Sequence, residues 1–286
     1  MPPRRPSPIG AHVPTTGGLA RGALKYAVGI GAEAIQVFVS NPRGWAATDG
    51  DPRDDRAFRE GCGAGRIPVF VHAPYLINLG SSTAATVTKS AAALRHALRR
   101  AAEIGAAGVV VHSGSAITGT RRDDALKQLR ETLLPILDEH PDGPLLLIEP
   151  TAGGGQALAS RIDQLGEYFT TLDGHPGLGV CLDTCHAFAA GHDLAAPGGV
   201  RTTLNLVVKT VGRGRLRLVH ANDSRDPLGS CRDRHVAIGE GTIGVDPFRE
   251  LFVHPATRNV PVVIETPGGA VGQRRDIQRL RDLRDH

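Results

Sequence analysis

Residues 108–112, GVVVH, and residues 145–149, LLLIE, decide how this chain of 286 residues folds. Each stretch is a short apolar run that ends in a side chain able to bind a metal, His112 or Glu149. Nearly continuous apolar runs are typical of parallel strands that are covered by helices on one side and packed against a core on the other. These two stretches therefore predict buried parallel strands with a polar residue at the end of each.

Further runs of the same kind lie on both sides of these two stretches, which brings the number of predicted strands to eight: residues 9–13, 34–39, 67–71, 108–111, 145–148, 178–182, 216–219 and 260–264. Segments of helical composition lie between them, such as residues 83–105, 121–139 and 157–172. An open doubly wound sheet usually has a glycine-rich phosphate loop after its first strand, and IGAHVPTTGG at residues 9–18 has none. The sequence therefore predicts an α/β protein, a single-domain (β/α)8 TIM barrel over residues 9–286 that follows a flexible basic arm at residues 1–8.

The composition narrows the class of protein. The net charge of +4 permits a polyanionic partner, but 33 basic and 29 acidic residues are well mixed along the chain. The four cysteines lack CxxC spacing, which favours reduced, buried thiols. No apolar run is long enough to span a membrane, and MPPRRPSP at residues 1–8 lacks the apolar core of a signal peptide. We expect a monomeric cytoplasmic protein.

Metal-binding residues follow six of the predicted strands, namely His72, His112, Glu149, Asp183, His220 and Glu265. Three more candidates, His186, Asp233 and His235, lie a short distance beyond strand ends. The carboxyl ends of barrel strands converge on one mouth, so these side chains are expected to meet there. Several carboxylates buried together are costly unless cations neutralise them. The pattern therefore predicts a metal centre.

Five histidines with four carboxylates suit Zn²⁺, with manganese or iron as possible substitutes. Nine ligands are too many for one tetrahedral ion, which indicates two or three ions. Closely spaced ions favour phosphodiester hydrolysis, because they stabilise both the attacking and the leaving oxygen. Sugar isomerases also combine histidine and carboxylate ligands on a barrel, so the ligands alone leave hydrolysis and isomerisation open.

Four local strings are more specific: HAPYLINLG at residues 72–80, VCLDTCHAFAAG at 180–191, HANDSRDPLGSCRDRHVAIGEGTIG at 220–244 and VIET at 263–266. They resemble the endonuclease IV family of apurinic/apyrimidinic endonucleases. The resemblance implies a zinc-dependent DNA-repair enzyme that cleaves duplex DNA on the 5′ side of an abasic site. The products it implies are a 3′-hydroxyl and a 5′-deoxyribose phosphate.

The same resemblance implies three zinc ions and assigns their ligands. His72 and His112 hold the first ion, and Glu149 connects it to a second ion. Asp183, His220 and Glu265 complete the second site, whereas His186, Asp233 and His235 hold the third ion. Glu149 is the catalytic carboxylate, and His12 lies beside the centre without binding a metal.

The resemblance also implies residues that contact DNA. NPRGW at residues 41–45 and YLIN at 75–78 match the segments that insert at the lesion, which makes Arg43, Tyr75 and Leu76 the candidates. An abasic site costs little to flip out of the helix, because it already lacks a base. Trp45 either contacts DNA or packs on the barrel rim, and Arg234 is expected to contact a phosphate.

Pro150 departs from the family pattern, in which asparagine usually follows the residue corresponding to Glu149. Proline removes a backbone donor and an amide side chain beside the catalytic carboxylate. This departure raises a non-enzymatic alternative, a protein that binds DNA lesions without cleaving them. Ser113, which follows His112 in place of the residues found in relatives, is a second departure that involves no predicted ligand.

Overall fold

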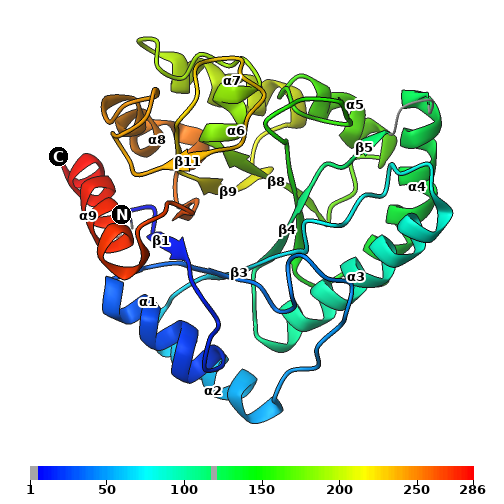
Figure 1. Cartoon of the computed structure of the whole chain (residues 1–286), viewed down its shortest axis with the longest axis horizontal. Coiled ribbons are helices and arrows are strands. Elements are labelled where there is room, and N and C mark those ends of the chain that lie inside the picture. Colours follow the sequence, from blue (N-terminus) through cyan, green and yellow to red (C-terminus); the bar gives the residue numbers. More distant parts are fainter. Residues whose placement is uncertain (1–5, 117–120) are drawn as a thin grey trace.

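The computed structural model describes residues 6–116 and 121–286, and within them eight parallel strands close into a barrel (Figure 1). Going round the barrel, the strands are β1 (Ile9–His12), β12 (Val262–Ile264), β9 (Leu216–His220), β8 (Leu178–Asp183), β6 (Leu145–Glu149), β4 (Gly108–His112), β3 (Val69–His72) and β2 (Ile35–Val37). Every predicted strand is present. The prediction of a single (β/α)8 barrel is confirmed.

Helices surround the barrel on its outer side (Figure 1). They are α1 (Lys25–Ile30), α2 (Pro52–Gly65), α3 (Ala84–Glu103), α4 (Arg122–Asp138), α5 (Gln164–Thr171), α7 (Gly199–Val211), α8 (Arg249–Val253) and α9 (Gly269–Asp285). A π-helical turn, Leu19–Leu24, precedes α1, and 3-10 turns at Asp246–Phe248 and Pro255–Thr257 flank α8. The short helix α6 (Thr184–Ala189) instead follows directly on β8. No helix among the described residues is both long and apolar enough to cross a membrane.

Two hydrophobic cores hold these layers together. The larger core lies between the strands and the helices, and a smaller one fills the barrel. The barrel interior contains Ala34, Phe70, Val110, Leu147, Cys181, Leu218 and Val263, all buried. A filled interior leaves only the ends of the barrel open, which places any site at the mouth.

One predicted helix is shorter than expected. The composition of residues 157–172 predicts a helix throughout, whereas α5 spans only Gln164–Thr171. Residues Gln156–Ala157 form strand β7, which pairs antiparallel with β5 (Ser115–Ala116). Next to this pair, the Ser113 hydroxyl donates to Ala159 O at 2.6 Å. Tertiary pairing therefore overrides the local helix propensity of this alanine-containing segment.

The first described residues already belong to the barrel. The Ser7 hydroxyl is buried and donates to Thr257 O at 2.8 Å, while Pro8 O accepts from Val262 N at 2.8 Å. We expected the arm to extend over residues 1–8. Its last two positions, Ser7 and Pro8, are instead hydrogen-bonded to the barrel. Residues 1–5 lie outside the described part of the chain.

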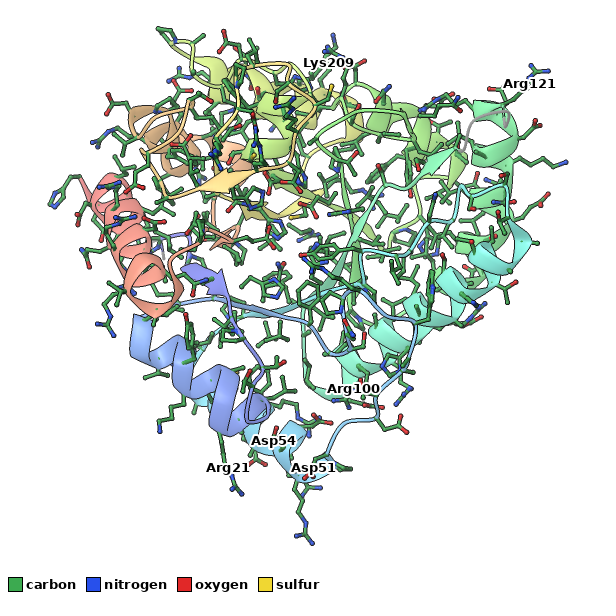
Figure 2. All side chains as sticks on the ribbon, in the orientation of Figure 1. Arg21, Asp51, Asp54, Arg100, Arg121 and Lys209 are labelled. Atoms are coloured by element: carbon green, nitrogen blue, oxygen red, sulfur yellow. The ribbon has the colours of Figure 1, made fainter. Side chains whose placement is uncertain are left out.

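A buried ion pair joins α3 to α2. Arg100 donates to both oxygens of Asp55, at 2.6 and 2.8 Å, and its side chain is only 5% exposed. Figure 2 shows Arg100 inside the outline of the molecule, whereas Arg21 and Arg121 project outward. We expect Arg100→Met to lower the free energy of unfolding by about 3–5 kcal/mol in urea titrations, because it leaves the Asp55 carboxylate buried without its partner.

The neighbouring residue supplies a control for this prediction. Arg99 forms ion pairs with Asp49 and Glu103, but its side chain is 48% exposed. Arg99→Met is expected to cost less than about 1 kcal/mol. The double variant Arg100→Met with Asp55→Leu should recover part of the lost stability. Equal effects of the two single variants would contradict a structural role for the buried pair.

Candidate metal centre and substrate-binding rim

All nine predicted ligands lie at the mouth formed by the carboxyl ends of the strands. The strand register accounts for much of this convergence, because His112 is the register partner of Glu149 and Asp183 is the partner of His220. A cavity of about 430 Å³ opens over the same mouth. A larger cavity of about 730 Å³ lies where the strands begin, and it is lined by none of the nine ligands. The candidate site therefore lies at the smaller cavity.

The ligand atoms gather in three overlapping groups. The first contains His72, His112 and Glu149, the second contains Glu149, Asp183, His220 and Glu265, and the third contains Asp183, His186 and His235. Within each group the candidate ligand atoms lie within 4.8 Å of one another. Glu149 belongs to both the first and the second group. It is thus placed to connect two metal positions.

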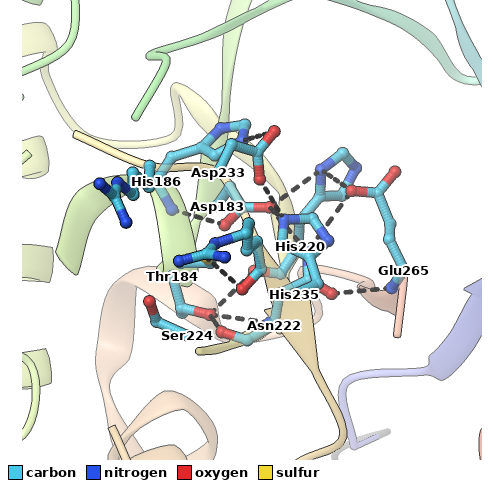
Figure 3. A network of polar contacts seen from close by, with 12 residues as sticks. Asp183, Thr184, His186, His220, Asn222, Ser224, Asp233, His235 and Glu265 are labelled. Carbon is cyan, nitrogen blue, oxygen red and sulfur yellow. Dashed lines mark hydrogen bonds and ion pairs between the residues drawn. The ribbon is translucent and has the colours of Figure 1, made fainter. Parts of the chain in front are cut away.

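Asp233 lies between the two histidines of the third group (Figure 3). Its Oδ2 is 3.1 Å from His186 Nε2 and its Oδ1 is 2.9 Å from His235 Nε2. The Asp233 side chain is 49% exposed, whereas Glu149 and His220 are buried. The third group therefore opens to solvent at the position where a substrate could approach a bound ion.

Local structure explains how β8 supplies two ligands. Asp183 is the N-cap of α6, and its Oδ1 accepts from His186 N at 2.9 Å. Aspartate is a preferred N-cap because its carboxylate satisfies a free backbone donor of the first turn. The same residue thus ends a strand, begins a helix and offers Oδ2 to the centre. His186 is carried back over the mouth by that first turn.

A small hairpin supplies the ligands that are most distant from any barrel strand. Strands β10 (Asp223–Ser224) and β11 (His235–Val236) pair antiparallel, and Asp233 lies just before β11. The Asp223 carboxylate stabilises this region by accepting four backbone hydrogen bonds, from Ser224, Gly239, Gly241 and Ile243, at 2.8 to 3.0 Å. Asp223 therefore stabilises the hairpin and the segment that follows it, beside Asp233 and His235.

The charges of the centre are strongly coupled. Burial alone raises the pKa of Glu149, but neighbouring histidines, His220 foremost, hold it well below the usual range. Burial also raises the pKa of Asp183 and lowers that of His112, the latter to about 4. Four carboxylates in one mouth attract positive charge, which either protons on the histidines or metal ions can supply.

One unsatisfied atom favours a metal ion. Glu149 Oε2 is buried and has no hydrogen-bond partner among the described residues. His72 Nε2 and His112 Nε2 approach Glu149 Oε2 to 3.3 and 3.5 Å without forming a hydrogen bond. Nitrogen and oxygen atoms that face one another across such gaps fit the ligand shell of a cation. The donor set therefore fits zinc.

Two histidine rings use Nδ1 to donate to backbone carbonyls. His72 Nδ1 donates to Ala73 O at 2.7 Å, and His186 Nδ1 donates to Pro150 O at 3.1 Å. Such bonds fix the ring orientation and leave Nε2 facing the centre. Pro150 therefore still performs one function, because a backbone carbonyl is present in every residue.

Zinc binding is expected to release protons. Burial lowers the pKa of His186 and His235, but Asp183 and Asp233 outweigh it, holding the pKa of His186 well above the usual range and raising that of His235 to about 11. Both rings are then protonated at neutral pH without metal. Because zinc requires the unprotonated ring, its affinity should rise with pH.

Calorimetric titration with zinc at pH 7, in two buffers of different ionisation enthalpy, measures this release. We expect about one proton or more per chain. Identical heats in both buffers, with zinc bound, would contradict the charge coupling described for His186 and His235.

Two cysteines come close to the ligands. Cys181 forms a possible group with Glu149 and His220, and Cys185 forms one with Asp233 and His235. Burial raises the pKa of the Cys181 thiol to about 12, which disfavours the thiolate that binds metal. All four cysteines are free, but the expectation that they are buried holds only for Cys62, Cys181 and Cys185, since Cys231 is exposed.

His12 lies beside the centre, as expected, and belongs to none of the ligand groups. Its Nδ1 is 3.4 Å from Glu265 Oε1, and its ring packs against Phe38 at 4.3 Å between centroids. Burial lowers the pKa of His12, since the opposing effect of Glu265 is smaller. His12 therefore lies against Glu265 without belonging to a ligand group.

The predicted DNA-contacting segments form one rim of the mouth. Tyr75 N donates to Pro42 O at 3.0 Å, which joins the loop that carries Arg43 to the loop that carries Leu76. Tyr75 and Leu76 are 47% and 36% exposed, so two neighbouring residues present apolar surface to solvent on this rim. The Tyr75 ring also lies 5.3 Å from the His72 ring, so the rim and the centre are contiguous.

Two other rim residues have protein partners. Trp45 is 36% exposed and lines a small cavity with Pro74 and residues of α3. Arg234 forms a two-pronged ion pair with Asp226, with Nε donating to Oδ2 at 2.6 Å. Its phosphate contact remains a prediction.

Sequence reasoning missed several polar residues that support the ligands, Gln36, Asn222 and Asp223. Asn222 donates to Asp183 Oδ2 at 2.7 Å and accepts from Glu265 N at 2.8 Å. Gln36 is a polar residue inside an otherwise apolar strand, AIQVFV at residues 34–39, and that irregularity is a detectable signal. The pattern of metal-binding residue types, by contrast, does not include amide side chains. That pattern alone could therefore not reveal Gln36 or Asn222.

Comparison with known proteins agrees with this fold. Residues 24–283 match a family described as the xylose isomerase-like TIM barrel. The protein named probable endonuclease 4 from Streptomyces coelicolor is 60% identical over 281 residues, covering 98% of this chain and 96% of that protein. Its namesake from Chloroflexus aurantiacus is 38% identical over 279 residues, covering 96% and 97%.

Some solved structures share only the fold of this chain, whereas others also share its family. A D-tagatose 3-epimerase-like protein has a TM-score of 0.71 at 18% identity, covering 96% of this chain and 98% of that one, and therefore shares the fold alone. Endonuclease IV from Thermus thermophilus has a TM-score of 0.85 at 33% identity and covers 99% of both chains. Together with the near full-length identity to the Streptomyces protein, this match shows that the chain belongs to the endonuclease IV family.

Proposed function

We propose that this protein is a DNA-repair endonuclease that hydrolyses the phosphodiester on the 5′ side of abasic sites in duplex DNA and leaves a 3′-hydroxyl and a 5′-deoxyribose phosphate. The observation that carries the proposal is the position of Glu149, a fully buried carboxylate shared by two ligand groups in a chain of this family. Three zinc ions are the proposed cofactor, and manganese or iron are possible substitutes.

The proposed ligands follow the family resemblance. They match the first two groups, whereas for the third ion Asp233 takes the place that Asp183 has in the third group. His72 and His112 would hold one ion, Asp183, His220 and Glu265 a second, and His186, Asp233 and His235 a third, with Glu149 shared by the first two. When bound, closely spaced zinc ions supply Lewis acidity and make hydroxide available near neutral pH.

The chain itself supplies orientation and charge. Neighbouring histidines keep the pKa of Glu149 low, so it is anionic at neutral pH and offers both oxygens. Asn222 holds Asp183 and the backbone of Glu265 in place. The exposed Asp233 and the half-open third group lie where a phosphate of the DNA could enter. These features support an in-line attack on a phosphate that is held at the mouth.

Arg43, Tyr75 and Leu76 are proposed to recognise the lesion. Exposed apolar side chains beside a metal centre suit insertion into a base stack, which costs a few kcal/mol of unstacking and is offset by a closely packed bent duplex. Because the rim loops are joined through Tyr75 and Pro42, insertion and phosphate placement are expected to be coupled.

Truncating the Leu76 side chain tests this proposed recognition of the lesion. We expect Leu76→Ala to raise the KM for an abasic duplex by about tenfold, since burying a leucine side chain contributes about 1.5–3 kcal/mol. Zinc content should be unchanged, because Leu76 belongs to no ligand group. Val253→Ala, a truncation of an exposed apolar residue at the end of α8, is the control. Equal KM values for the two variants would argue against insertion.

A nicking assay tests the function. The zinc-loaded protein should cut a duplex containing a tetrahydrofuran abasic analogue on its 5′ side, and it should leave the undamaged duplex intact. Tight binding without nicking would support the lesion-binding alternative that Pro150 raises. Activity on a sugar with at most two metal ions per chain would support an isomerase instead.

A further inference from the structure

Gln36 is a buried amide inside strand β2. Its side chain has no solvent exposure, although the residues on either side, Ile35 and Val37, belong to the apolar core. Its register partner on β1 is His12. A buried polar side chain is costly unless its donors and acceptor are all satisfied, so its partners define its role.

Each end of the amide has a partner at the metal centre. Gln36 Nε2 lies 2.8 Å from Glu265 Oε1 and 2.9 Å from His12 Nδ1, and Gln36 Oε1 lies 2.8 Å from His220 Nε2. The orientation of the amide follows from chemistry, because a carboxylate can only accept and therefore faces the NH2 end. The oxygen end must then accept from His220 Nε2.

This hydrogen bond determines which nitrogen of His220 could bind a metal. With Nε2–H directed at Gln36, that nitrogen is Nδ1, which lies 3.0 Å from Glu149 Oε1 and 3.3 Å from Glu265 Oε2 and, without a metal, is hydrogen-bonded to Glu149. Nδ1 thus faces the group made of Glu149, Asp183, His220 and Glu265. The opposite tautomer would direct a hydrogen at the metal position and leave two acceptors, Nε2 and Gln36 Oε1, in contact.

We propose that Gln36 is a positioning residue for the second metal site, where it holds His220 in the Nε2–H tautomer and holds one oxygen of Glu265 in place. This inference rests on the proposed metal centre. Gln36 contacts one ligand through its acceptor and another through its donor, so a single amide orients two of the four ligands of that site. Residues that orient metal ligands in this way typically affect metal affinity 10- to 100-fold.

Two substitutions separate the acceptor contact from the donor contacts. Gln36→Met keeps a similar volume and removes all three hydrogen bonds. Gln36→Glu keeps an acceptor for His220 Nε2 and loses the donor to Glu265 and His12. Gln164→Met is the control, since Gln164 also accepts hydrogen bonds, from Ser160 N and Arg161 N, at the start of α5.

The readouts are zinc affinity, from competition with a chromophoric chelator, and the tautomer of His220, from imidazole 1H–15N spectra of the zinc-loaded protein. A spectrum of His220→Asn identifies the signal. In Gln36→Met we expect one zinc equivalent to bind about 10- to 100-fold more weakly, with the others unchanged. In Gln36→Glu the Nε2–H signature should remain. Gln164→Met should match the wild type in both measurements.

The outcomes distinguish this inference from the proposed function. If the wild-type chain binds no zinc, the metal centre itself fails. If the wild type binds zinc and Gln36→Met binds it equally well with the same His220 tautomer, only the role of Gln36 is overturned. Should Gln36→Met fail to fold, loss of the Nε2–H signature in Gln36→Glu would also overturn that role.

Discussion

Glu149→Gln is expected to reduce nicking of an abasic duplex by roughly 1,000-fold or more, with little change in KM. The reason lies in the contacts of both carboxylate oxygens. Oε1 is 3.0 Å from His220 Nδ1, and Oε2 is 3.3 Å from His72 Nε2. Glutamine replaces one anionic oxygen by an amide nitrogen that cannot bind a metal. The connection between the first two ligand groups is then lost.

Single-turnover kinetics on a tetrahydrofuran duplex, together with metal analysis of the same preparation, measure this effect. We expect fewer zinc equivalents per chain in the variant and an unchanged far-UV circular dichroism spectrum. Glu167→Gln is the matched control, because Glu167 is half exposed on α5 and pairs with Arg122 away from the mouth. Full activity of Glu149→Gln would rule out the proposed mechanism.

Removing zinc should abolish nicking and lower the melting temperature by about 10 °C or more. The physical reason is the concentration of charge, since Glu149, Asp183, Asp233 and Glu265 share one mouth and Glu149 and Asp183 are buried. An ion present at about 1,000 times its Kd stabilises the folded state by about 4 kcal/mol, and the proposal places three ions here.

Dialysis against a strong chelator, followed by metal analysis, nicking and thermal melting, tests this prediction. Adding zinc back should restore both activity and stability, whereas magnesium should restore neither, because histidine-rich sites disfavour it. The Arg100→Met variant provides a useful comparison. Its loss of stability should persist whether or not zinc is present, since Arg100 and Asp55 lie between α2 and α3. Undiminished nicking by metal-free protein would contradict a metal-dependent reaction.

Much of the fold could be predicted from the sequence because its signals are local. Each barrel strand is a short apolar run, and each of the six ligands at a strand end follows directly in sequence. The segment at residues 157–172 shows where local signals fail. Its composition favours a helix throughout, but Ala157 at its start pairs with Ser115 in a small sheet and the helix begins only at Gln164. Such pairing between distant segments leaves no local pattern.

The sequence by itself determined the eight strands, the identity of the nine candidate ligands and, through its local strings, the family. The family resemblance also implied how those ligands divide among three ions, but only the tertiary structure decided that they lie close together. His112 meets Glu149 because of the register between β4 and β6, and a one-residue shift would separate them. It also decided which nitrogen of His220 faces the centre, since that depends on Gln36, 184 positions away in sequence. Hydrogen bonds between distant strands are set by barrel closure, and no local run of residues encodes them.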